Sequence, residues 1–192
     1  GFKVPYHTDD NETDIEEFGK RISSRFKSFC AEYGKNLRLE FEPGKYLVSQ
    51  AGVFLVRVNS LKQTTATVFA QVNSGFNHFI RPMFYEAYHE IVNISNPNGQ
   101  KKLYTVVGNI CETDTFATDR SIPSINEGDI LAFLNAGAYC FQMTSNFNSR
   151  PRPAEVMYFN GHPHLIRERE SYKDILQHQI RLNLDPKFKQ IE

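Results

Sequence analysis

The sequence predicts the end of an α/β barrel, a partial (β/α)8 barrel, followed by a mostly antiparallel β-barrel or sandwich domain. Near the start, an amphipathic helix pattern, a glycine and a short alternating segment follow one another, as in a (β/α) barrel. Beyond about Ala51, short β-rich runs follow each other without helical patterns between them, which is typical of antiparallel folds. We therefore expect residues 1–51 to belong to the barrel and residues 52–192 to form the β-domain.

The first element is a helix, expected from about Asp14 to Tyr33. Thr13 and Glu16 have the spacing of a capping box, and Gly34 is a plausible C-cap. Apolar residues recur at spacings of three and four and so form one stripe, made of Ile15, Phe18, Ile22, Phe26 and Phe29.

The next element is a short strand. Residues Asn36–Phe41 alternate between apolar and polar or charged side chains, which predicts a strand. Glu42-Pro43-Gly44-Lys45 follows directly. Active-site residues of barrels lie at strand ends, and a glycine lets the backbone approach a ligand closely, so Glu42 is a candidate site residue.

The β-domain is expected to contain several short strands separated by turn residues, and to end in a short helix over Ser171–Ile180. The turns are marked by Asn73–Gly75, Asn96–Gly99 and Asn126–Asp129. The predicted strands are Val53–Val58, Ala66–Val72, Glu90–Ile94, Leu103–Ile110 and Ile130–Leu134.

Composition limits the possible partners. The 192 residues carry 22 basic and 22 acidic side chains, so nothing indicates a nucleic-acid or membrane-surface partner, and no apolar run approaches 18 residues. The three cysteines Cys30, Cys111 and Cys140 lack metal-ligand spacing, which favours a reduced, cytoplasmic setting. His162-Pro-His164 has no third ligand, so no metal site is expected. The other histidines that show no partner spacing are His7, His78, His89 and His178.

Chemically useful side chains follow several of the predicted strands. Cys111-Glu112-Thr113-Asp114 places a thiol beside two carboxylates, and a thiol can donate a proton near neutral pH. A cysteine after an apolar strand is, however, most often a buried small hydrophobe. Arg81 and Tyr85 would share a face if Arg81–His89 were helical, and an arginine can bind a carboxylate through two parallel bonds. A structural ion pair is the alternative.

Five motifs in this order resemble the diaminopimelate decarboxylase family, pyridoxal-phosphate enzymes with the alanine-racemase-like fold. The motifs are Glu42–Ser49, Asn77–His89, Val107–Asp114, Gly137–Tyr139 and Ser145–Val156. Each motif alone would be a weak signal, but five at compatible spacing are specific. The resemblance runs nearly from end to end of the chain.

The resemblance implies roles for the residues around the cofactor. Glu42 would face the pyridine nitrogen of pyridoxal 5′-phosphate, with Gly44 beside the cofactor. Lys45 stands where the family usually has arginine, near the phosphate and the substrate carboxylate, and lacks the bidentate fork of arginine. Tyr139 would touch the phosphate or the substrate. Gly1 would be the last glycine of a phosphate-binding loop, unless it is a cloning remnant.

The resemblance also implies roles for the residues around the substrate. Arg81 and Tyr85 would hold a substrate carboxylate, and Cys111 would be the general acid that protonates the carbanion. Glu112 would bind the distal ammonium group of the substrate, with Asp114 in a supporting role.

The function implied is conversion of meso-2,6-diaminopimelate to L-lysine and CO2. The lysine that forms the Schiff base with the cofactor is expected upstream of Gly1, so we expect the fragment alone to be inactive without the N-terminal half. A homodimer with active sites shared across its interface is implied. Two alternatives remain: another basic amino-acid decarboxylase of the same fold (for ornithine, arginine or carboxynorspermidine), or a non-catalytic assembly module.

Overall fold

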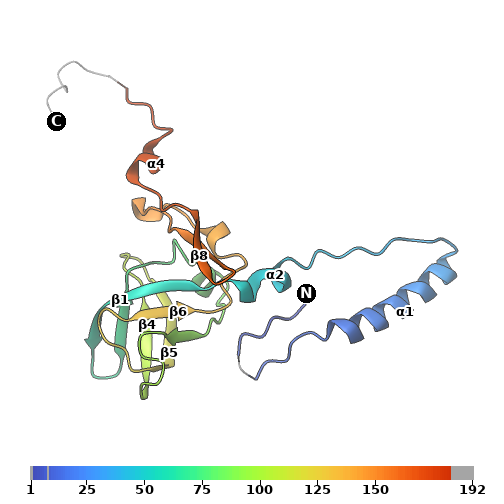
Figure 1. Cartoon of the computed structure of the whole chain (residues 1–192), viewed down its shortest axis with the longest axis horizontal. Coiled ribbons are helices and arrows are strands. Elements are labelled where there is room, and N and C mark those ends of the chain that lie inside the picture. Colours follow the sequence, from blue (N-terminus) through green and yellow to red (C-terminus); the bar gives the residue numbers. More distant parts are fainter. Residues whose placement is uncertain (1, 8, 183–192) are drawn as a thin grey trace. The chain divides into compact units, whose positions relative to one another are not determined.

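A computed structural model describes residues 2–7 and 9–182 of the chain (Figure 1). The chain divides into two compact units, Gly1–Thr144 and Ser145–Glu192. This division separates the last strands from the rest, whereas the boundary predicted near Ala51 separates a barrel part from a β-domain. That predicted boundary therefore stays a prediction.

The long helix α1, Ile15–Tyr33, confirms the first expected element. Gly34 caps its C-terminus with a left-handed backbone, at φ 74°. The N-terminal cap differs from the prediction by one residue: the Asp14 carboxylate, at 2.9 Å, accepts the backbone N–H of Glu17. Thr13 does not cap the helix, because its hydroxyl accepts the backbone N–H of Lys3 instead.

An aromatic cluster ties the start of the chain to α1 and to the segment that follows it. The Phe2 ring lies 5.2 Å from the ring of Phe18 on α1, 6.1 Å from Phe41 and 5.7 Å from Tyr46. Such edge and tilted aromatic contacts stabilise by about 0.5–1.5 kcal/mol each beyond the area that they bury. They hold the short helix α2, Gly44–Val48, near the N-terminal segment.

The strand expected at Asn36–Phe41 is wrong. This segment is irregular, and α2 and a 3-10 turn at Ser49–Ala51 follow it. A strand forms only where its backbone N–H and C=O groups pair with a neighbour, and the described residues supply no strand beside this segment. Glu42 accordingly lies in an irregular segment and not at a strand end, and the residues that the structure describes form no part of a (β/α) barrel.

The first unit is built on a six-stranded sheet in the order β3-β6-β1-β2-β4-β5. All neighbours are antiparallel except β2 and β4. The end strands β3 and β5 also contact each other, so the sheet curves into a nearly closed, mostly antiparallel barrel, as the sequence predicts (Figure 1). The strands are β1 Phe54–Gln63, β2 Val68–Val72, β3 Ile91–Asn93, β4 Lys101–Val107, β5 Thr115–Pro123 and β6 Ile130–Phe133.

Five of these strands overlap the five that the sequence predicts, and β5 was not expected. The core inside the sheet centres on Phe79, which is fully buried between Phe54 and Phe133 at ring distances of 5.0 and 5.5 Å. Phe79 lies only two residues before Arg81, so the packing of this ring fixes the start of the short helix α3, Arg81–Phe84.

The second unit contains a hairpin and a short helix. Strands β7, Glu155–Phe159, and β8, His162–Arg167, are joined by Asn160-Gly161, whose positive φ values of 50° and 80° are those of a type I′ turn. Helix α4 spans only Tyr172–Leu176 within the longer predicted segment, and a Ser171–Asp174 capping box begins it.

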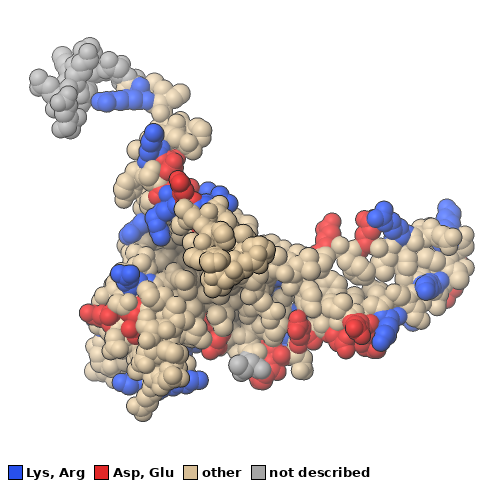
Figure 2. All heavy atoms as spheres, in the orientation of Figure 1, with Lys and Arg blue, Asp and Glu red and all other residues tan. Residues whose placement is uncertain are grey.

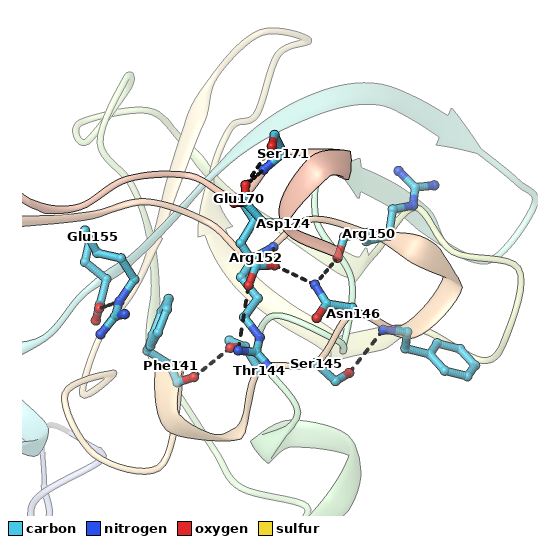
Figure 3. Close-up of polar contacts among 12 residues, drawn as sticks. Phe141, Thr144, Ser145, Asn146, Arg150, Arg152, Glu155, Glu170, Ser171 and Asp174 are labelled. Atoms are coloured by element: carbon cyan, nitrogen blue, oxygen red, sulfur yellow. Dashed lines mark hydrogen bonds and ion pairs between the residues drawn. The ribbon is translucent and has the colours of Figure 1, made fainter. Parts of the chain in front are cut away.

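Polar contacts hold the segment before the hairpin to the segment after it (Figure 3). The Glu170 carboxylate accepts the side-chain N–H of Asn146 at 2.6 Å and the backbone N–H of Arg152 at 2.8 Å. The same Asn146 amide also donates to the carbonyl of Arg150. The Glu170 carboxylate therefore holds the Ser145–Val156 motif to the segment that follows β8.

Charges of both signs occur on the visible face (Figure 2), in keeping with the net charge of zero. No helix in residues 2–7 and 9–182 is both long and apolar enough to cross a membrane.

Candidate functional site

The candidate site centres on Arg81, a buried cation. Arg81 is the first residue of α3, and only 7% of its surface is exposed. Its Nε donates to Nε2 of His89 at 3.2 Å, and its Nη2 donates to the hydroxyl of Tyr6 at 3.3 Å. Among the described residues, no carboxylate forms an ion pair with it. A buried charge without an opposite charge is costly, so this position favours an anionic ligand.

His89 is the neutral neighbour of Arg81. It is 2% exposed, and its Nδ1 lies 2.8 Å from the carbonyl oxygen of Leu134. Burial lowers the pKa of His89 to about 4, and the positive charges of Arg81, Arg120 and Lys45 act in the same direction. The imidazole is therefore uncharged at neutral pH.

A second cation, Lys45, lies over the ring of Tyr6. The Lys45 ammonium is 5.3 Å from the centre of the Tyr6 ring, within the range of a cation–π contact. The edge of the same ring packs against His89. The carbonyl of Pro5 accepts a hydrogen bond from the side chain of Asn135, which fixes this segment on the sheet. Tyr6 thus brings two positive charges to one place.

Tyr139 meets α2 at its first residue. Its hydroxyl lies 3.3 Å from the point where a Cβ on Gly44 would sit, so a larger residue at position 44 would crowd this hydroxyl. The φ of Tyr139 is 56°, in the left-handed region that side chains other than glycine rarely adopt. Such strain persists only where the surroundings impose it and often marks a functional position.

Two glycines allow this approach. A Cβ on Gly137 would lie 1.7 Å from the carbonyl oxygen of Val48, and a Cβ on Gly52 would lie 2.4 Å from the Cα of Gly137. The backbone N–H of Gly137 donates to the carbonyl of Ser49 at 2.9 Å. The segment that carries Tyr139 is therefore in direct backbone contact with the end of α2.

The acidic cysteine motif occupies the loop between β4 and β5. Cys111 and Glu112 are exposed, and the Cys111 thiol donates to the Glu112 carboxylate at 3.4 Å. Asp114 is buried, and its carboxylate accepts the backbone N–H groups of Phe76 at 2.8 Å and Ile110 at 3.3 Å. Through these two hydrogen bonds, Asp114 holds the loop that presents the thiol. Burial raises the pKa of Asp114.

Comparison with known proteins finds a family similarity in the middle of the chain. Residues 45–137 match the family described as "Pyridoxal-dependent decarboxylase, C-terminal sheet domain". This stretch of the chain is therefore similar to that sheet domain. The match covers α2 from Lys45 onward, the strands β1 to β6, and Arg81 and His89, but it leaves out Tyr6 and Tyr139.

Relatives extend the similarity to nearly the whole chain. A diaminopimelate decarboxylase from Methanothermobacter thermautotrophicus is 44% identical over 182 residues, which are 93% of this chain and 42% of that protein. One from Campylobacter jejuni is 39% identical over 91% of the chain and 42% of that protein. The crystal structure of the M. jannaschii enzyme in complex with L-lysine, 33% identical, superposes with a TM-score of 0.86 over 93% of this chain and 41% of that one. The chain thus spans about two fifths of the length of these relatives.

Several residues of the candidate site have the chemistry to fit the anionic groups of pyridoxal phosphate and an amino acid. The Tyr139 hydroxyl lies against Gly44, and Lys45 is the next residue of α2; a hydroxyl and an ammonium both suit a phosphate. Arg81 suits a carboxylate. No group of three or more His, Cys, Asp or Glu side chains that could hold a metal occurs in the part of the chain that the structure describes.

The structure thus brings some of the predicted residues together. Gly44 and Lys45 share α2 with the Tyr139 contact, and the Arg81 guanidinium is 5.7 Å from the centre of the half-exposed Tyr85 ring. Glu42 is exposed just before α2, and Gly1 lies outside the described residues. Cys111 and Glu112 belong to the separate β4–β5 loop. The roles assigned to all of these residues stay predictions.

Sequence reasoning did not identify Tyr6 or His89 as site residues. His89 was set aside because it has no partner at metal-ligand spacing, and its actual partners, Arg81 and Leu134, lie 8 and 45 residues away. The available signal was its position at the end of the Asn77–His89 motif.

Proposed function

We propose that the chain is part of a pyridoxal-phosphate-dependent diaminopimelate decarboxylase, which converts meso-2,6-diaminopimelate to L-lysine and CO2. The observation that carries the proposal is the buried Arg81, whose positive charge has no carboxylate partner among the described residues. Similarity to diaminopimelate decarboxylases over more than 90% of the chain selects this reaction from others that need an anion site.

Arg81 would bind a carboxylate of the substrate through its guanidinium, with the Tyr85 hydroxyl as a second donor. Lys45 and Tyr139 would hold the cofactor phosphate and the nearby substrate, together with the backbone at Gly44 and Gly1. A lysine in place of arginine at position 45 binds as a point charge, so it leaves the orientation of the phosphate to Tyr139 and the backbone.

Pyridoxal phosphate, when bound, supplies an electron sink for the electron pair that remains when CO2 leaves. Glu42 would keep the pyridine nitrogen protonated. Cys111 would then protonate the α-carbon: the S–H bond breaks, a C–H bond forms, and the thiolate regains a proton from solvent. Glu112 would bind the distal ammonium of the substrate and so favour a diamino acid.

The test uses the intact protein that contains this chain. CO2 release is measured with meso-diaminopimelate, and with ornithine, arginine and carboxynorspermidine as competing substrates. Release from meso-diaminopimelate alone supports the proposal. Release only from one of the others would assign a different decarboxylase, and no release from any substrate by cofactor-loaded protein would favour an assembly module.

Two variants separate the proposed roles in the cysteine motif. Cys111→Ala should lower kcat by about 10²–10⁴-fold with cofactor binding unchanged, because one positioned proton donor is lost. Glu112→Gln should mainly raise KM, because it removes the charge that attracts the distal ammonium. Turnover at the parental rate in Cys111→Ala would make this thiol a packing residue.

We further propose that the active form is a homodimer in which the β4–β5 loop completes the site of the neighbouring subunit. Exposure of Cys111 and Glu112 on this loop supports the idea. Mixing inactive Cys111→Ala subunits with subunits that lack the cofactor lysine should restore part of the activity, since one site per mixed dimer is whole. A verified mixed dimer without activity would reject the shared site.

The proposed function has two further consequences. The 192-residue chain by itself should release no CO2. Its three cysteines form no disulfide, which suits a cytoplasmic enzyme.

A further inference from the structure

We propose that His89 is a positioning residue that fixes the guanidinium of Arg81 for carboxylate binding by acting as a neutral hydrogen-bond acceptor. The inference rests on the proposed function of Arg81 as the carboxylate-binding residue. It adds a residue that touches no substrate and acts through Arg81.

The two partners of His89 allow only one form of the ring. The carbonyl oxygen of Leu134 can only accept a hydrogen bond, so Nδ1, 2.8 Å away, must carry a proton. Nε of Arg81 can only donate, so Nε2 of His89, 3.2 Å away, must be unprotonated. Both contacts are satisfied only by the neutral ring with its proton on Nδ1.

The ring is held rigidly in this place. Leu134 directly follows β6, and its own N–H donates to the carbonyl of Glu90 at 2.9 Å, so the accepting carbonyl is part of the sheet. Phe79 packs edge-on against the imidazole at 4.6 Å, and Tyr6 packs against it at 5.5 Å. The sheet therefore determines the direction of Nε2, and Nε2 determines the direction of Arg81.

The two bonds that Arg81 makes leave its binding edge available. Nε and Nη2 lie on one edge of the planar fork, and their partners, the His89 imidazole and the Tyr6 hydroxyl, are not carboxylates. The end of the fork, formed by Nη1 and the second hydrogen of Nη2, has the spacing that binds a carboxylate through two bonds. A carboxylate in place of His89 would position the arginine equally well but would neutralise the charge that the substrate needs.

Protonation of His89 would destroy the arrangement. The charged groups that act on the ring are Arg81, Lys45 and Arg120, all positive, and the Tyr6 ring packs against it. A proton on Nε2 would point at the N–H of Arg81 and add a like charge. Carboxylate binding should therefore weaken below about pH 5, as His89 begins to charge.

The tautomer can be tested directly on the 192-residue chain. Long-range ¹H–¹⁵N correlation spectra distinguish the two neutral tautomers from the charged ring, and loss of one signal set in His89→Gln assigns the residue. The expected result is a protonated Nδ1 and an unprotonated Nε2 that stays so from pH 7 to pH 5. A proton on Nε2, or titration of His89 near pH 6.5, would overturn the proposal.

The positioning role is tested by binding of L-lysine to the intact, cofactor-loaded protein, measured by calorimetry. His89→Phe keeps the ring packing but cannot accept a bond, and it should weaken binding by about 10- to 100-fold, since a hydrogen bond to a charged group is lost. His89→Gln, whose side-chain oxygen can accept from Arg81, should bind within a few-fold of the parent. Tyr104→Phe removes one buried hydrogen bond, to Ile125, and serves as the matched control that should leave binding unchanged.

Steady-state kinetics should agree, with KM raised in His89→Phe and kcat little changed, because the substrate and the transition state lose the same contact.

Arg81→Met separates this inference from the proposed function. If Arg81→Met weakens binding and His89→Phe does not, His89 has no positioning role and the role of Arg81 stands. If Arg81→Met binds L-lysine normally, Arg81 does not bind the carboxylate and both are wrong. Should His89→Phe not fold, His89→Asn, which reaches Leu134 but not Arg81, makes the same comparison.

Discussion

The folded chain should lose stability as the pH falls, and His89 should account for a defined part of that loss. The pKa of a histidine is near 6.5 in the unfolded chain, and burial lowers it to about 4 in the fold. Because the folded state disfavours the proton, the stabilising contribution is present above pH 6.5 and is lost as the pH approaches 4.

The two pKa values set the size of the effect. Between pH 7 and pH 5, the free energy of unfolding should fall by about 2 kcal/mol through this residue, and by about 3 kcal/mol at pH 4. His89→Gln cannot titrate, so it should lack this part of the pH dependence.

The assay is urea unfolding of the 192-residue chain at several pH values between 7 and 4.5, for the parent and for His89→Gln. The chain has no tryptophan, so far-ultraviolet circular dichroism is the suitable signal. The difference between the two proteins cancels the titration of the carboxylates and of the other histidines. A difference that stays constant from pH 7 to pH 5 would refute the reasoning, because His89 would then be protonated equally in both states.

Three further changes test other parts of the site, each by urea unfolding of the chain. Gly137→Ala should destabilise the fold by about 1–3 kcal/mol, because its Cβ would overlap the Val48 carbonyl. The control is Gly19→Ala, on α1 with open space around it, which should stabilise the fold by about 0.5–1 kcal/mol. Equal effects of the two changes would contradict the close contact of Gly137 with Val48. Asp114→Ala should cost about 2–4 kcal/mol, because two backbone N–H groups lose their acceptor, and an unchanged midpoint would show that Asp114 does not hold its loop. Arg81→Met should not lower the midpoint, because it removes a buried charge that no described carboxylate balances, and a loss above about 1 kcal/mol would mean that Arg81 is a structural residue.

Local patterns predicted the elements whose stability is local. The apolar stripe predicted α1, and Gly34 marked its end, because both signals arise within the helix itself. The Asn36–Phe41 alternation failed because a strand depends on a partner that the pattern does not describe. β5 was missed because Thr118-Asp119-Arg120 interrupts its apolar pattern in the middle of the strand. The hairpin of β7 and β8 carried a usable signal, Asn160-Gly161, that was not used.

The candidate site was predictable only in part. Motifs identified Lys45, Arg81 and Tyr139, since their residue types and order carry information by themselves. The network of Tyr6, His89 and Arg81 was not predictable, because it joins residues 75 and 8 positions apart and depends on burial of the imidazole. The left-handed backbone of Tyr139 is likewise imposed by packing and leaves no trace in the residue type.

The two pairings of strand β1 have a consequence for the order in which the chain folds. Its first half, Phe54–Arg57, pairs with β6, whereas the pairing with β2 begins at Val58. Pairing of β1 with β2 closes only a short local loop. Pairing of β1 with β6 must close a loop of more than 70 residues, so this pairing carries most of the entropic cost of the sheet and should form late. Gly137 follows β6 by only four residues and needs Ser49 as its acceptor, so the Tyr139 contact with α2 can form only after that closure. A partly folded chain would therefore have the hairpins but no binding site, and amides of β6 should gain protection from hydrogen exchange later than those of β2.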